Sequence, residues 1–251
     1  MKLLAAFQTL SFLHSFHSQY NNPEREVQQF RCGILPVVAV ATRNSGGKTK
    51  LAMSPNDSHP VNGVEENPSC SATTNINEAP VLVSSVLPPL PSGSRRIYLL
   101  RHGETDWNVL GKIQGGGFDI PLNDNGRQQA FTTALALEDI PLGVVASSHL
   151  SRAKETADIL WARHSETVQD RRVIFSGLAE MRFGEFEGLA WRDQEVDPAL
   201  AERFKTISRE LKQDVDKAFP GGGESTRDVQ IRSTEALHQI LKDHPDQQHI
   251  A

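Results

Sequence analysis

An arginine, a histidine and a glycine follow directly after an apolar run in YLLRHGETDWN, residues 98 to 108. A neutral imidazole such as that of His102 is a competent nucleophile near neutral pH. Its attack on a phosphoryl group requires the phosphoryl charge to be neutralised, and the planar fork of the Arg101 guanidinium matches phosphate oxygens. Gly103 would let an anion approach the backbone closely. The tripeptide indicates phosphoryl chemistry, with a core histidine beside a surface arginine as the alternative.

Further polar residues follow at positions that suit the same chemistry. Thr105 and Asn108 carry a hydroxyl and an amide that can donate to phosphate oxygens. Gln114 precedes a glycine run that starts at Gly115, for which a surface loop is the alternative interpretation. Arg152 stands at the start of an expected helix, just after a strand, where a helix N-terminus favours anions. Taken alone, Arg152 would more often be a solvated helix residue.

A carboxylate completes the set of candidate catalytic groups. Glu180 lies in LAEMRFGEFEG, and an acid beside a phosphate pocket can hold a proton and give it to a leaving oxygen. Glu185 and Glu187 lie in the same stretch, and we interpret both as surface acids.

The elements that must position these side chains alternate between strand and helix. The expected strands cover 95–101, 142–148 and 172–177, and the expected helices begin near 123 or 124, 150, 198 and 225. This alternation predicts an α/β fold with a mostly parallel sheet. Because ligands collect at the carboxyl ends of such strands, we expect Arg101 and Arg152 to face one site.

Composition separates the chain into two parts. We expect the domain to cover 94–251 and residues 1–93 to form a leader and a disordered linker rich in Ser, Pro and Asn. The opening MKLLAAFQTLSFLHSF is apolar, and no acidic residue occurs before Glu24. It suits entry into a plastid, a mitochondrion or the secretory pathway, whereas an unprocessed N-terminus would leave the protein in the cytoplasm.

The overall charge limits the class of partner. A net charge of −5 and a pI of about 6.0 argue against nucleic-acid binding and favour a small-molecule substrate. No apolar run reaches the ~18 to 20 residues of a membrane span. The two cysteines, Cys32 and Cys70, offer neither a disulfide framework nor a metal-binding spacing. Nothing in the sequence indicates an oligomeric state.

Five motifs occur in an ordered set that resembles the histidine phosphatase superfamily, also called the phosphoglycerate mutase-like family. They are LLRHGETDWN, IQGGGFDIPLNDNGRQQA, VVASSHLSRAKETA, LAEMRFGEFEG and PGGGES. The resemblance extends nearly continuously over 96–251. It implies a three-layer α/β/α sandwich with a mostly parallel sheet, and a covalent phosphohistidine mechanism that uses no metal or other cofactor.

The resemblance also implies a role for each candidate residue. His102 would be the nucleophile, and Glu180 would be the proton donor and acceptor. Arg101 and Arg152 would grip the phosphoryl group, with Asn108 beside them. The residues that would line the phosphate or substrate side are Thr105, Gln114 and Gly115.

The sequence departs from the family pattern at its end. The family has a second histidine in a Ser-His-Gly stretch after the next strand, whereas this sequence reads LKDHPDQQHIA up to Ala251. By family spacing, HIA begins that strand, and His249 lies too early to replace the second histidine. We expect this sequence to be part of a longer protein, or else a short form that is weak or inactive.

Two reactions fit the resemblance, and a third reading fits a degenerate member. A phosphatase lets water take the phosphoryl group, whereas a mutase returns it to a sugar acid. Glu180 and Gly221 are only about forty residues apart, and this short connection is similar to the phosphatase branch. We therefore predict hydrolysis of a small phosphomonoester. The alternatives are phosphoglycerate mutase activity and an inactive or phosphate-ligand-binding member.

Overall fold

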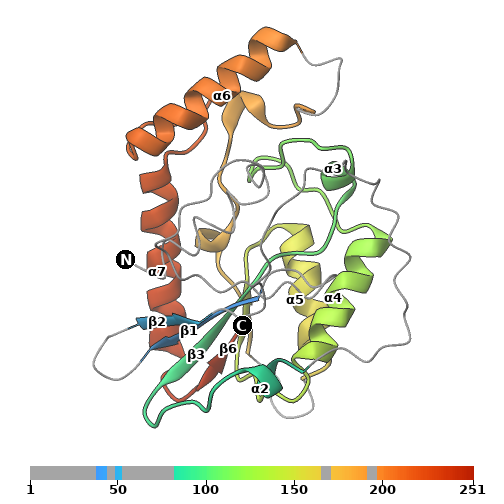
Figure 1. The fold of residues 1–251 in the computed structure, drawn as a ribbon, viewed down its shortest axis with the longest axis vertical. Coiled ribbons are helices and arrows are strands. Elements are labelled where there is room, and N and C mark those ends of the chain that lie inside the picture. Colours follow the sequence, from blue (N-terminus) through green and yellow to red (C-terminus); the bar gives the residue numbers. More distant parts are fainter. Residues whose placement is uncertain (1–37, 44–48, 53–81, 165–170, 191–196) are drawn as a thin grey trace, which may run out of the picture.

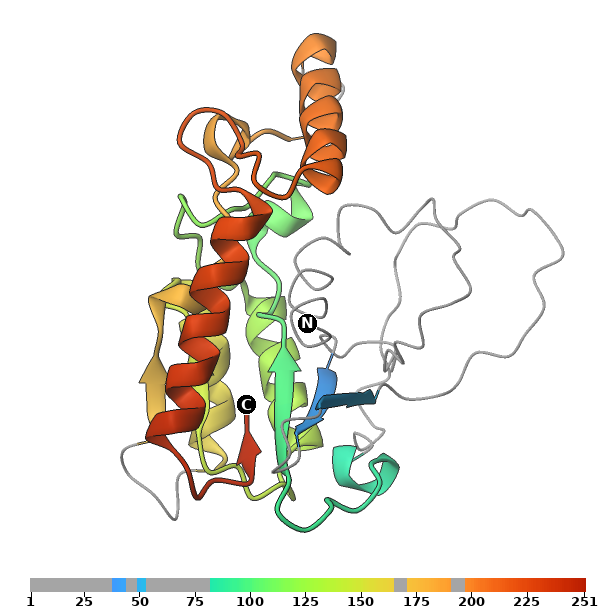
Figure 2. The same ribbon diagram turned by 90° about the vertical axis from the view of Figure 1, so that its left-hand side faces the viewer.

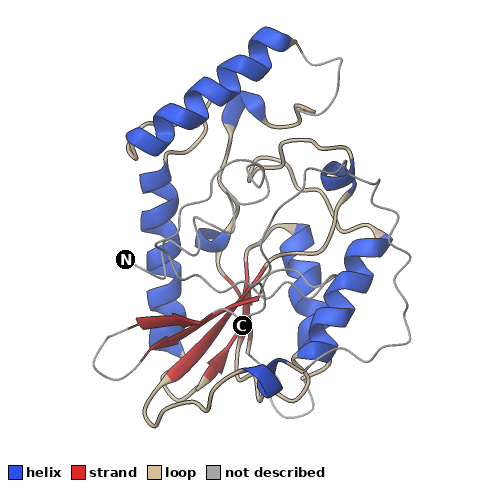
Figure 3. Ribbon diagram, in the orientation of Figure 1, coloured by secondary structure: helices blue, strands red, loops and turns tan. Residues whose placement is uncertain are grey.

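The computed structural model describes residues 38–43, 49–52, 82–164, 171–190 and 197–251. Strands gather in the centre, with α4 and α5 on one side and α7 on the other (Figures 1 and 3). The three-layer α/β/α arrangement expected from the sequence is therefore confirmed.

The central strand is β3, which carries the apolar run before Arg101. β3 (Arg95–Leu100) pairs in parallel with the short β6 (His249–Ile250), and Arg96 lies opposite His249. On its other edge β3 pairs antiparallel with β1 (Val38–Arg43), which in turn pairs antiparallel with β2 (Thr49–Ala52). The strand order of this sheet is β2-β1-β3-β6.

A second ladder continues the first through the last residues of the chain. β4 (Val145–Ser147) pairs in parallel with β5 (Arg172–Ile174). Val144 forms a parallel bridge with Ile250, and the amide of Ala251 donates to the carbonyl of Val144 at 2.9 Å. The section from β3 through β6 and β4 to β5 is thus parallel, as expected, and β1 and β2 add an antiparallel edge.

Helices α4 (Asp124–Ala136) and α5 (Ser151–Ala162) cover one face of this sheet. Asn123 caps α4 by accepting a hydrogen bond from the amide of Gly126 at 2.8 Å, as its position in the sequence predicts. Small residues let the two helices approach the strands closely. The buried core on this side comprises Tyr98, Ala134, Ala136, Leu137, Ile140, Leu142, Val145, Ala157 and Leu160, together with Val83 from the short α2 (Val83–Val86).

Helix α7 (Thr226–Asp243) covers the opposite face and runs nearly along the strands (Figure 2). Ser225 and Asp228 form a capping box at its start, and His244 is its C-cap. Ile240 packs against Val144 and Ile250 in a separate core cluster. The sheet is therefore buried on both faces, which fits its near-continuous apolar strands.

A third core cluster lies under α6 (Pro198–Gln213). Asp197 caps this helix and Pro198 occupies its first turn, where its missing N–H costs nothing. Phe204 of α6 packs against Phe186 and Phe219, with ring centroids 5.3 and 5.8 Å away. This aromatic cluster joins α6 to the loops that follow β5.

Several short elements are absent from the sequence-based expectations. They are α3 (Asp106–Val109) and two 3-10 turns, η1 (Ser176–Leu178) and η2 (Gly184–Phe186). The strands β1 and β2 and the helix α2 lie within residues 1–93, the stretch for which we expect a leader and linker. The opening apolar segment lies outside the described residues.

Within these described ranges, none of the helices combines the length and the apolar character needed to cross a membrane.

We expect Leu160→Ala to lower the free energy of unfolding by about 2 to 5 kcal/mol, because it opens a cavity in a closely packed core. Leu160 is 1 % exposed and contacts the cluster between α5 and the sheet. The measurement is urea denaturation. Ile231→Ala on the outer face of α7, where the side chain is 50 % exposed, is the matched control and should change stability by less than about 0.5 kcal/mol. Equal losses in the two variants would contradict this packing.

Candidate active site

The nucleophile predicted from the sequence stands in the loop directly after β3. Nδ1 of His102 lies 2.7 Å from the carbonyl oxygen of Gly103. A carbonyl only accepts, so this hydrogen bond requires the hydrogen of the neutral ring to be on Nδ1. The lone pair of the ring is then on Nε2, and the histidine has the tautomer that a nucleophile needs.

Gly103 is required by a close backbone approach. A Cβ at Gly103 would overlap the carbonyl oxygen of Gly126 in the first turn of α4, and a Cβ at Gly126 would overlap the carbonyl oxygen of Glu104. The amide of Gly103 also donates to Oγ1 of Thr156 in α5 at 3.1 Å. The loop that carries His102 is thus held between α4 and α5, so its glycine serves packing as well as any approach of an anion.

Four of the predicted residues line one cavity. Arg101 and His102 come from the end of β3, Arg152 from the first turn of α5, and Glu180 from the loop after η1. The cavity has a volume of about 220 Å³, and strand residues such as Val145 form its apolar wall. The sheet thus brings together groups that are up to 79 residues apart in the sequence (180 minus 101).

Charge in this cavity is partly buried and net positive. Burial lowers the pKa of Arg101, and the neighbouring Glu180 carboxylate opposes that shift. Burial likewise lowers the pKa of Arg152, against the charges of Glu180 and Asp119. Arginine stays protonated despite such shifts. Two guanidinium groups therefore face one carboxylate, an arrangement that suits a dianionic phosphoryl group beside a proton carrier.

Arg152 also holds the glycine run in place. Its Nη1 donates to the carbonyl of Phe118 at 3.2 Å and its Nη2 to the carbonyl of Gly115 at 3.1 Å. The amide oxygen of Gln114 accepts from Nη1 at 3.1 Å and from Nε at 3.0 Å. These contacts use four of the five guanidinium N–H groups. Among contacts within the described chain, one Nη2–H is left for a ligand.

The other predicted binding residues form a polar cluster behind this arginine. Thr105 caps α3, accepting from the amide of Asn108, and its hydroxyl also accepts from the amide nitrogen of Gln114 at 2.6 Å. Oδ1 of Asn108 accepts in return from the amide of Thr105 at 3.1 Å. Thr105 is fully buried. The structure therefore brings Thr105, Asn108 and Gln114 together and links them to the cavity through Arg152.

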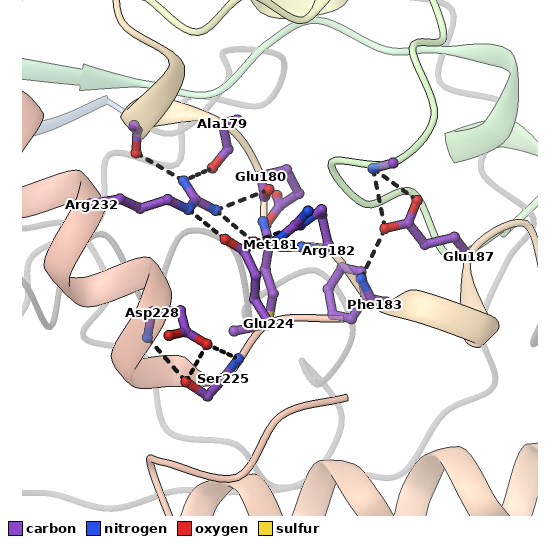
Figure 4. A network of polar contacts seen from close by, with 12 residues as sticks. Ala179, Glu180, Met181, Arg182, Phe183, Glu187, Glu224, Ser225, Asp228 and Arg232 are labelled. Carbon is purple, nitrogen blue, oxygen red and sulfur yellow. Dashed lines mark hydrogen bonds and ion pairs between the residues drawn. The ribbon is translucent and has the colours of Figure 1, made fainter. Parts of the chain in front are cut away.

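Glu187 proves to be more than a surface acid. Its carboxylate accepts from the amide of Gly117 at 3.0 and 3.2 Å and from the amide of Phe183 at 2.9 Å, so it ties the glycine run to the loop after Glu180 (Figure 4). The interpretation as a solvated acid is corrected by these bonds. Glu185, by contrast, forms an ion pair with Arg203 on α6 at 2.7 Å.

Asp119 is a structural residue that sequence reasoning missed. The N-cap of α5 is Leu150, whose side chain cannot accept a hydrogen bond. Asp119 replaces the missing cap from 32 residues away and accepts from both the amide and the hydroxyl of Ser151 at 2.6 Å. The only sequence signal is indirect, namely a helix start that lacks a local capping residue.

No group of three or more His, Cys, Asp or Glu side chains that could hold a metal ion occurs among the residues that the structure describes.

Comparison with known proteins identifies the chain's relatives. Residues 97–251 match the model of the histidine phosphatase superfamily (branch 1). Phosphoglycerate mutase-like protein 4 of Arabidopsis thaliana is 41 % identical over 151 residues, or 59 % of this chain and 61 % of that protein. The metal-independent phosphoserine phosphatase of the same plant is 38 % identical over 152 residues, or 59 % of each protein. The chain thus spans about three fifths of the length of these relatives.

A solved structure also matches. The Bacillus stearothermophilus protein YhfR is 32 % identical, over 61 % of this chain and 71 % of that one, with a TM-score of 0.48.

The Asp119 cap predicts a dependence of stability on pH. Burial raises the pKa of Asp119, but the Ser151 hydrogen bonds and the charges of Arg152 and His149 outweigh burial and hold this pKa below its usual range. A depressed folded-state pKa contributes stability at neutral pH that is lost as pH falls through that pKa. We expect Asp119→Ala to lose about 1 kcal/mol at pH 7 and less near pH 3, in urea denaturation.

A double-mutant cycle with Ser151→Ala separates the cap from other effects of removing the charge. The two substitutions should be less than additive at pH 7. A loss that stayed constant from pH 7 to pH 3 would rule out the cap as its source.

Proposed function

The chain belongs to the histidine phosphatase superfamily (branch 1), and from that premise we propose that it hydrolyses small phosphomonoesters through a phosphohistidine at His102. The observation that carries this proposal is the Nδ1 hydrogen bond of His102 to the Gly103 carbonyl, within a cavity that also holds Arg101, Arg152 and Glu180. A fixed tautomer, two cations and one carboxylate are the parts that phosphoryl transfer to histidine requires.

In the first step, Nε2 of His102 attacks phosphorus and the bond from phosphorus to the ester oxygen breaks. The protonated Glu180 carboxyl gives its proton to that leaving oxygen, so the alcohol departs neutral. The Arg101 and Arg152 guanidinium groups neutralise the charge on the phosphoryl oxygens. The Gly103 carbonyl stabilises the positive charge that develops on the imidazole ring through the Nδ1 hydrogen bond.

In the second step, water attacks phosphorus and the bond from Nε2 to phosphorus breaks. The Glu180 carboxylate accepts the proton of that water and is protonated again for the next cycle. His102 regains its lone pair on Nε2, and inorganic phosphate leaves the cavity. Atoms and protons balance over the two steps without a metal or another cofactor.

We further propose that the phosphoryl group passes to water, as in a phosphatase, and not back to a sugar acid, as in a mutase. The names of several relatives support it: a phosphoserine phosphatase and a glucosyl-3-phosphoglycerate phosphatase are among them. The connection between Glu180 and Gly221 also holds only η2 and α6 among its described elements. We propose a small phosphorylated metabolite as substrate, and residues 94–251 as the catalytic domain.

We expect His102→Ala to lower phosphate release from p-nitrophenyl phosphate by a factor on the order of 10³ or more, because it removes the nucleophile. The same variant should lose the acid-labile phosphoprotein that forms with a ³²P-labelled phosphoester. His238→Ala, on the exposed face of α7, is the matched control and should retain both activities.

Two results would refute the proposal. One is a well-folded wild-type protein that binds phosphate but never forms a labelled intermediate, which would indicate a binding member of the family. The other is efficient interconversion of 2- and 3-phosphoglycerate with little phosphate release, which would indicate a mutase.

A further inference from the structure

We propose that the ion pair of the buried Glu224 with the half-buried Arg232 positions Glu180, because it holds the loop that carries this carboxyl against the cavity. The inference rests on the proposed function, since it assigns the pair to the proton-transfer part of that reaction. Glu224 comes from the PGGGES stretch and Arg232 from the second turn of α7. Neither lines the cavity itself.

Arg232 binds the backbone on the N-terminal side of the acid-bearing loop. Its Nη1 donates to the carbonyls of Gly177 and Ala179 at 2.8 and 2.7 Å, and its Nη2 donates to the carbonyl of Glu180 at 3.1 Å (Figure 4). The 3-10 turn η1 ends at Leu178, and these carbonyls belong to its last residues and to the irregular loop that follows. One guanidinium group thus fixes three carbonyls, including that of the proton carrier.

Glu224 binds the backbone on the C-terminal side of the same loop. Its Oε2 accepts from the amide of Arg182 at 2.9 Å, and its own amide donates to the carbonyl of Arg182 at 2.8 Å. The loop is therefore held at Glu180 by Arg232 and two residues later by Glu224. Only the backbone of Met181 lies between these two fixed points.

The two charged side chains also bind each other. Oε1 and Oε2 of Glu224 accept from Nε and Nη2 of Arg232 at 2.8 and 3.0 Å, a bidentate pair. With the three carbonyls, Arg232 uses all five of its N–H groups. Lysine has three donors on a single nitrogen and no planar fork, so it cannot reproduce this pattern.

The capping box of α7 sets the position of the pair along the chain. Ser225 and Asp228 fix the first turn of the helix directly after Glu224, with Oδ2 of Asp228 accepting from the Ser225 amide at 2.9 Å. Arg232 lies in the second turn of α7, on the side of the helix that faces the loop. The burial of Glu224 raises its pKa, but the hydrogen bonds from Arg232 and the Arg182 amide hold it below the usual range. Glu224 is therefore ionised and cannot replace Glu180 as proton donor.

A buried ion pair is weak evidence for stability, because desolvation offsets most of the attraction. Glu224 is 7 % exposed, and the pair directs its remaining hydrogen bonds to a single loop. The need to place Glu180 explains why the protein would keep this ion pair although the pair adds little stability. A carboxyl that delivers a proton must lie within hydrogen-bond reach of the leaving oxygen, and a loop free to shift by 1 Å would lose much of that effect.

The test uses leaving groups of different basicity. p-Nitrophenolate is a weak base that departs without a proton, whereas the alkoxide of phosphoserine or glycerol phosphate requires one. We expect Arg232→Lys to lower kcat/KM for the alkyl phosphates by a factor of about 10 to 100, a fraction of the usual gain from a general acid. kcat/KM for p-nitrophenyl phosphate should change less than about threefold, a margin too small to reflect a lost catalytic group. kcat/KM is the measurement of choice because it excludes the second step, in which Glu180 acts on water for every substrate.

Two reference variants make this pattern specific. Glu180→Gln should show the same dependence on leaving group, because it removes the proton itself. Arg227→Lys changes another arginine of α7 whose Nε pairs with Asp216 at 2.9 Å far from the loop, and it should leave both substrates unaffected. Equal losses of kcat/KM on both substrate types in Arg232→Lys, or no loss on either, would overturn the proposal.

A second measurement does not depend on turnover. Amide hydrogen exchange in residues 177–182 should be faster in Arg232→Lys than in the wild type or in Arg227→Lys, because the loop loses its anchors. Unchanged exchange there would refute the positioning role even in a protein without phosphatase activity. If the wild type is inactive but exchange is faster in the variant, the proposed function is refuted, whereas the role of the Glu224–Arg232 pair in holding the loop is supported.

Discussion

The site depends on one constraint: irregular loops near a buried cavity must find partners for their backbone N–H and C=O groups. No sheet ladder does this for the glycine run or for the loop around Glu180. Buried and half-buried charged side chains do much of it instead. Arg152 and Arg232 bind carbonyls of the two loops, while Glu187 and Glu224 bind their amides. The same contacts that satisfy the loops also fix groups that line the cavity.

This constraint explains why arginines serve two purposes in the molecule. A guanidinium group has five donors in a fixed plane, so one side chain can hold a loop and still present charge to an anion. Arg152 divides its donors in this way. Arg232, in contrast, uses all of its N–H groups to bind the loop and the Glu224 carboxylate. The difference follows from position, because Arg152 lines the cavity and Arg232 lies behind its wall.

Close backbone packing supplies the remaining rigidity. The loop after β3 lies so near the first turn of α4 that a Cβ at Gly103 would overlap the Gly126 carbonyl, and a Cβ at Gly126 would overlap the Glu104 carbonyl. His102 is therefore fixed by its neighbours on both sides before any substrate binds. In the proposed reaction, preorganisation of this kind would hold the nucleophile and the charges in place without reorganisation.

The sequence by itself determined the main helices and the strands they cover, and it indicated the chemistry of the site. Strand and helix periodicity located β3, α4, α5 and α7, since these depend on local patterns and caps. The residue types around His102 indicated phosphoryl transfer. Only the tertiary structure decided what Glu187 and Asp119 do, because their partners lie 70 and 32 residues away. Hydrogen bonds between distant loops leave no periodic signal in the sequence. From the sequence alone, these carboxylates are therefore interpreted as solvated.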